Sequence, residues 1–89
     1  MIERQATIVN PEGLHARPAA RIVRLANSFA AEIELAKDGL DVNGKSIMGV
    51  MMLAAEEGST IKVRAEGPDA DQAIEALKQL VAGKFGGEP

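Results

Sequence analysis

Turn-forming residues divide this chain into short segments in which apolar residues repeat with two different periods. Alternation of apolar and polar residues, typical of half-buried strands, is found in 1–9, 31–37, 40–42 and 60–66. A period of about 3.6 residues, typical of amphipathic helices, is found in 15–28, 46–55 and 69–83. No connection is long enough to separate two domains, so we expect one domain over 1–89 in which 84–89 is a loose C-terminal tail.

The segments follow the order strand, helix, strand, strand, helix, strand, helix. An alternating strand has one apolar and one polar face, so these strands are predicted to form an antiparallel sheet with one face in water. The apolar stripes of the helices must then cover the other face. We therefore expect an α+β fold, an open-faced two-layer sandwich in which three helices cover a four-stranded antiparallel sheet (βαββαβα).

Polar residues mark the predicted ends of several elements. Asp38-Gly39 predicts a tight hairpin between the second and third strands. Ser46 is expected to cap the helix that follows it. Asp69, with Gln72 three residues later, resembles a capping box for the last helix.

The charge of the chain is unevenly distributed. The net charge is −3, yet the stretch 14–29 contains Arg17, Arg21 and Arg24 and no acidic residue. A positive island on an acidic protein favours a specific anionic ligand or an acidic partner surface. The acidic balance, together with the absence of tyrosine and tryptophan, argues against nucleic acid as a partner.

The composition also limits the site chemistry and the compartment. No apolar run approaches the length of a bilayer span, so we expect no direct membrane insertion. The chain has no cysteine, which excludes a disulfide framework and favours a cytoplasmic location. A single histidine without cysteine also argues against a zinc site, and we expect no metal and no cofactor.

The single histidine, His15, lies where the turn 10–13 leads into the first helix. If His15 is the N-cap, the amides of Ala16 and Arg17 form an anion site at the positive end of the helix dipole. That field disfavours imidazolium, so we expect a neutral ring with one free lone pair, which is a competent nucleophile for a phosphoryl group. The positive charge of Arg17 lies in the first turn, where it interacts unfavourably with the helix dipole. Helix stability therefore does not explain this residue, which points to a role in balancing phosphate charge.

Simpler interpretations of the same residues stay open. A lone histidine at a helix start is often an ordinary cap or surface residue. A row of arginines such as Arg21 and Arg24 is often a solvated helix face.

Two motifs identify a family. The run Gly13-Leu14-His15-Ala16-Arg17-Pro18-Ala19 resembles the active-site motif of HPr, the histidine phosphocarrier of the phosphoenolpyruvate-dependent sugar phosphotransferase system. The run from Asn43 to Gly49 is similar to the second signature of that family, and the resemblance extends along almost the whole chain. It implies a stoichiometric phosphoryl carrier rather than an enzyme. Enzyme I would phosphorylate Nδ1 of His15, Arg17 would neutralise the phosphate, and enzyme IIA would receive the group.

The resemblance also implies a second phosphorylation site and a docking surface. In part of the family the serine at the position of Ser46 is phosphorylated by HPr kinase/phosphorylase, which would bring in that kinase and a regulatory protein as partners.

The helix after Ser46 is apolar on all sides, with Val50, Leu53 and Ala54 on one side and Ile47, Met48 and Met51 on another. Only one side can face the sheet, so the methionine side is expected to be exposed for several partners, unless it covers the edge of the core. The predicted partner-binding residues are Ala20, Arg21, Arg24, Ile47, Met48 and Met51.

Other functions remain possible for these residues. A small phosphatase could use the same anion site, although no water-activating carboxylate or metal cluster accompanies His15 in the sequence. A purely regulatory binding protein of the same fold is a further alternative, and the presence of His15 argues against the HPr-like paralogues that lack it. The sequence does not separate sugar transport from the nitrogen-related branch of the system.

Overall fold

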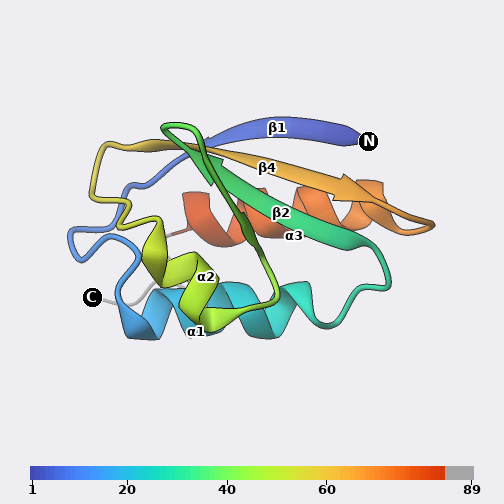
Figure 1. Cartoon of the computed structure of the whole chain (residues 1–89), viewed down its shortest axis with the longest axis horizontal. Helices are drawn as coiled ribbons and strands as arrows, with labels where there is room; N and C mark the ends of the chain where they lie inside the picture. Colours follow the sequence, from blue (N-terminus) through green and yellow to red (C-terminus); the bar gives the residue numbers. More distant parts are fainter. Residues whose placement is uncertain (84–89) are drawn as a thin grey trace.

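The computed structural model describes residues 1–83, and it confirms the predicted order of elements. The elements are β1 (Ile2–Thr7), α1 (Ala16–Ala26), β2 (Glu32–Lys37), β3 (Leu40–Asn43), α2 (Ile47–Met52), β4 (Thr60–Glu66) and α3 (Ala70–Ala82). The strands form one antiparallel sheet in the order β1-β4-β2-β3, and the helices lie beneath it (Figure 1). The fold is therefore the expected α+β open-faced sandwich. The tail predicted at 84–89 lies outside the described residues.

The hydrophobic core lies between the sheet and the helices. The central strand β4 directs Ile61, Val63 and Ala65 inward, as the alternation predicts. The α1 residue Ile22 and the α3 residue Leu77 pack against this face, and both are almost fully buried. The hairpin between β2 and β3 also follows the prediction, since Asp38 and Gly39 both have positive φ.

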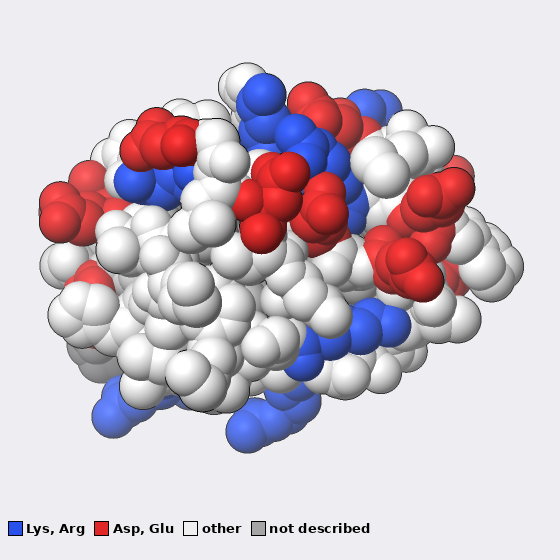
Figure 2. Space-filling view, viewed as in Figure 1, with Lys and Arg blue, Asp and Glu red and all other residues white. Residues whose placement is uncertain are grey.

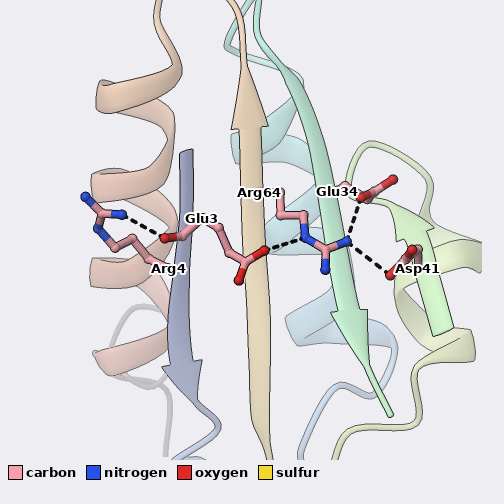
Figure 3. Close-up of polar contacts among 5 residues, drawn as sticks. All are labelled: Glu3, Arg4, Glu34, Asp41 and Arg64. Carbon is pink, nitrogen blue, oxygen red and sulfur yellow. Dashed lines mark hydrogen bonds and ion pairs between the residues drawn. The ribbon is translucent and has the colours of Figure 1, made fainter. Parts of the chain in front are cut away.

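The polar face of the sheet is organised around Arg64 of β4 (Figure 3). Its Nε donates to Glu3 Oε1 on β1 at 2.8 Å, and its Nη1 donates to Glu34 Oε1 on β2 at 3.0 Å and to Asp41 Oδ1 on β3 at 3.2 Å. The hydrogen bond from Arg64 lowers the pKa of Glu3. One guanidinium thus connects all four strands on the face opposite the helices.

The end of α2 differs from the prediction. Its N-cap is as expected, because the Ser46 hydroxyl accepts a hydrogen bond from the Gly49 amide at 3.2 Å. The helix was expected to reach residue 55 but ends at Met52, and Ala54 follows in the left-handed region with a φ of 51°. This turn exposes Ala54, which was predicted to face the sheet, and buries Ala55 instead.

The capping box predicted for α3 is wrong. Asp69 is the N-cap residue, but its side chain makes no capping hydrogen bond. Its two carboxylate oxygens instead accept from the backbone amides of Ala30 and Ala31, each at 2.8 Å. Asp69 therefore holds the segment between α1 and β2 against the start of α3, a long-range contact that local sequence does not encode.

This contact predicts acid-sensitive stability. The hydrogen bond from the Ala30 amide lowers the pKa of Asp69 below its ordinary value. A carboxyl whose pKa is lowered by folding stabilises the fold fully above its unfolded pKa, about 3.9, and loses that contribution as pH falls through the folded pKa. We expect Asp69→Asn to lower the urea midpoint at pH 7, and the difference from the native chain to shrink below about pH 4. A midpoint difference that stays constant down to the acid limit would contradict this role.

Candidate functional site

The loop before His15 is fastened to the loop before β4. Ile8 N donates to Ser59 O at 2.8 Å, Gly58 N donates to Ile8 O at 2.7 Å, and Leu14 N donates to Ala55 O at 2.9 Å. The two loops come from distant parts of the sequence. Their pairing determines the position of His15, the residue that follows Leu14.

Gly13 makes this close approach possible. Its φ is +68°, a conformation that disfavours residues with a side chain, and a Cβ at this position would lie 2.5 Å from Ala55 O. The buried side chain of Asn10 completes the turn, because its Nδ2 donates to Gly13 O at 2.9 Å. Sequence reasoning identified the turn but not Asn10 as its buried anchor.

His15 is the N-cap of α1, as predicted. Its backbone is extended, with φ −75° and ψ −173°, and its carbonyl accepts from the Ala19 amide at 2.9 Å. The ring is exposed and makes no capping hydrogen bond, which leaves the imidazole outside the helix hydrogen-bond pattern. The first amides of any helix lack intrahelical acceptors, so those of Ala16 and Arg17 are at the positive end of the dipole beside this ring.

The next two residues differ in burial. Arg17 is exposed in the first turn of α1, whereas Pro18 is buried against the core. Pro18 lacks an N–H, and it occupies a first-turn position where no intrahelical bond is lost. The first turn of α1 is thus anchored by Pro18 while Arg17 faces solvent.

A hollow of about 520 Å³ adjoins His15. It is lined by Leu14, His15 and Ala16 at the start of α1 and by Met51, Ala54, Ala55 and Glu56 at and after the end of α2. Met51, which was predicted to be on the exposed side of its helix, lines this hollow together with His15. Glu56 was missed, because only the pairing of the two loops brings this residue to the hollow.

The predicted partner-binding residues lie around this hollow and along α1 and α2. On α2, Ile47, Met48 and Met51 are exposed, so Met48 does not cover the core edge. On α1, Ala20 and Arg21 are half-buried and Arg24 is exposed. Figure 2 shows an uncharged surface over α2 with lysine and arginine side chains along its lower edge.

Met52 is an exposed residue of the same surface that sequence reasoning missed. Its position four residues after Met48 is the signal that could have found it, since residues at this spacing share a helix face. Ser46 is half-buried at the opposite end of α2 from the hollow. The structure therefore does not place Ser46 beside His15.

The family model of the PTS HPr component phosphorylation site matches residues 2–83. The phosphocarrier protein HPr of Cupriavidus necator is 46% identical over 97% of both chains. The HPr-like protein Crh of Halalkalibacterium halodurans is 52% identical over 86% of this chain and 92% of its own length.

Solved structures agree with these relatives. The structure of HPr-C-His from Thermoanaerobacter tengcongensis matches with a TM-score of 0.95 at 47% identity, over 100% of both chains. HPr from Bacillus anthracis matches with a TM-score of 0.87 at 48% identity, over 90% of this chain and 95% of its own. Within residues 1–83, no helix combines the length and the apolar character that a bilayer span needs. The match over nearly the whole chain, in both sequence and fold, shows that this protein belongs to the HPr family of phosphotransferase-system phosphocarriers.

Proposed function

We propose that this chain accepts a phosphoryl group from phospho-enzyme I on Nδ1 of His15 and passes it to a sugar-specific enzyme IIA in the cytoplasm. The observation that carries the proposal is the position of His15. Its exposed ring lies at the start of α1 and is not used for capping. Partners can therefore reach a nitrogen that is already next to a helix N-terminus.

The transfer needs few groups from this chain. A lone pair of the neutral ring attacks phosphorus as the bond to enzyme I breaks, and the reverse steps deliver the group to enzyme IIA. Phosphoryl transfer has a loose transition state, so positioning and charge stabilisation supply most of the acceleration. In the proposed mechanism, the first-turn amides of Ala16 and Arg17, with the Arg17 guanidinium, stabilise the phosphoryl charge by charge-assisted hydrogen bonds.

Docking is assigned to the exposed faces of α1 and α2. The α2 face is apolar and carries Ile47, Met48 and Met51, while α1 contributes Arg21 and Arg24. Flexible methionines adapt to partners of different shape, and arginines attract acidic partner surfaces. One surface can thus serve both enzyme I and enzyme IIA.

Incubation with phosphoenolpyruvate and enzyme I tests the carrier function. A carrier takes up one acid-labile phosphoryl group per chain and then stops. Glu56 lines the hollow beside His15, and a carboxylate there could activate water for a phosphatase reaction. Steady release of phosphate, with no labelled chain, would therefore favour the phosphatase and overturn the proposal. If the phosphorylated chain donates its phosphoryl group to a nitrogen-related acceptor and not to a sugar-specific enzyme IIA, the protein belongs to the nitrogen-related branch of the system.

Arg17 is expected to matter more than an arginine elsewhere on the same helix. Arg17→Gln removes a charged donor beside the phosphoryl group, and we expect kcat for phosphorylation by enzyme I to fall by about tenfold to hundredfold. Arg24→Gln is the matched control, because Arg24 is exposed in the last turn of α1. We expect Arg24→Gln to affect the KM of enzyme I for this protein rather than kcat. Equal losses of kcat in the two variants would remove Arg17 from its assigned role.

We also propose that Ser46 is a regulatory phosphorylation site for HPr kinase/phosphorylase, and that its phosphate weakens docking of enzyme I. Ser46 lies at the N-cap of α2, where a negative charge is compatible with the helix dipole. The charge would therefore act on the partner and leave the fold intact. An acidic surface on enzyme I, complementary to the arginines of α1, would be repelled by it.

Ser46→Asp tests this effect against Ser46→Asn. The two side chains have the same shape and both cap helices well, so only the charge differs. We expect the aspartate variant to raise the KM of enzyme I for this protein by about tenfold at low salt, and the difference to decrease as salt screens it. Equal KM values for the two variants at low salt would refute a charge-based mechanism.

A further inference from the structure

All the sulfur in this chain belongs to methionine, and all four methionines are exposed residues. The chain has four methionines and no cysteine. The exposed fractions are 76% for Met1, 72% for Met48, 42% for Met51 and 63% for Met52. Methionine commonly fills gaps in hydrophobic cores, but none does so here. All four methionine side chains are thus at the surface and outside the core.

Three of these four methionines are concentrated on one short helix. Met48, Met51 and Met52 belong to α2, which has six residues. Met51 also lines the hollow that contains His15. Met1 precedes β1 in the sheet layer, whereas α2 lies in the helix layer beneath it (Figure 1). The accessible thioethers are thus gathered on the face that the proposed function uses for docking.

We propose that Met48, Met51 and Met52 form a peroxide-sensitive modification site, and that their oxidation to methionine sulfoxide weakens the docking of enzyme I. This inference rests on the proposed function. In the reaction, a sulfur lone pair attacks one oxygen of hydrogen peroxide and forms a sulfur–oxygen bond as the oxygen–oxygen bond breaks. The released hydroxide takes the proton from the transferred oxygen and leaves as water, so sulfur is oxidised and peroxide is reduced.

The expected consequence follows from the change in polarity. A sulfoxide is polar, and burying it against an apolar partner surface without a hydrogen bond is unfavourable. The core contains no methionine, so the fold should be retained and the effect confined to binding. Methionine sulfoxide reductases reverse the oxidation with electrons from thiols, which makes the modification a reversible one.

Two variants separate the α2 methionines from Met1. Met1→Leu leaves only the α2 thioethers, whereas Met48→Leu/Met51→Leu/Met52→Leu leaves only Met1. Leucine does not react with peroxide, so the triple variant is compared with its own untreated form, whatever its basal KM. Each protein is treated with hydrogen peroxide, and peptide mass spectrometry identifies the residues that have gained oxygen. Circular dichroism checks the fold, and phosphorylation by enzyme I is then measured.

For oxidised Met1→Leu we expect oxygen at all three α2 methionines and a KM for enzyme I raised about fivefold or more. Methionine sulfoxide reductase with a thiol should restore the original KM. The triple leucine variant should have the same KM before and after peroxide treatment. If peroxide leaves the α2 thioethers unmodified, or if KM is unchanged in a protein shown to carry the sulfoxides, this inference is overturned. The proposed function would still stand. Failure of the untreated protein to accept phosphoryl from enzyme I would overturn the proposed function instead.

Discussion

Replacement of His15 with alanine is expected to abolish phosphoryl uptake from enzyme I. The chain contains no other histidine, so no second imidazole can take over the reaction. The first-turn amides and Arg17 would remain in the variant, but they hold a phosphoryl group without being able to accept one covalently. The measurement is the amount of acid-labile phosphate bound per chain after incubation with labelled phosphoenolpyruvate and enzyme I.

The same substitution should leave the fold almost unchanged. The His15 ring is exposed and makes no capping hydrogen bond, so the free energy of unfolding is expected to change by less than about 0.5 kcal/mol. His15→Asn is a second variant, because asparagine is a good N-cap and lacks the nucleophilic nitrogen. Both variants should be equally inactive. Native stoichiometry of labelling in either one would exclude His15 as the phosphoryl acceptor.

Gly13→Ala is expected to cause the largest loss of stability among the substitutions considered. The added methyl group would lie 2.5 Å from Ala55 O and 3.0 Å from the Cα of Glu56, both of them backbone atoms. The φ of +68° adds a conformational cost for any residue with a Cβ. We expect the free energy of unfolding to fall by about 2–4 kcal/mol, measured by urea denaturation.

Gly39→Ala provides the control for the conformational part of this cost. Gly39 also has a positive φ, +83°, but nothing lies within 4 Å of a Cβ built there. Its loss of stability should therefore be only about 1 kcal/mol. The Gly13 variant should in addition transfer phosphoryl more slowly, since the clash displaces the Leu14–Ala55 contact next to His15. Equal destabilisation by the two substitutions would show that the two loops do not need their close approach.

Most of the fold was predictable because its signals are local. The alternation of Ile61, Val63 and Ala65 identifies β4, and the Asp38-Gly39 pair identifies the hairpin. Apart from the end of α2, each element begins and ends within two residues of its prediction. The end of α2 was mispredicted because Ala54 adopts a positive φ that its residue type does not announce.

The candidate site was predictable in part for the same reason. His15 as N-cap and Arg17 in the first turn follow from where the turn ends and the helix period begins. Met51 and the exposed side of α2 follow from helical spacing. Glu56 and Asn10 could not be identified, because their positions depend on a second loop that lies far away in the sequence.

Local signals are enough to predict the element order, the inward faces and the histidine at the start of α1, since period and turn chemistry act over a few neighbouring residues. The three-dimensional packing of distant segments was needed to show that the carboxylate of Asp69 holds the Ala30 and Ala31 amides and does not cap its own helix. The same packing sets the loop of Gly13 on that of Ala55 and so places His15 beside Met51 and Glu56. These contacts join residues about 40 apart along the chain, where the partner is selected by packing and hydrogen-bond satisfaction rather than by local pattern.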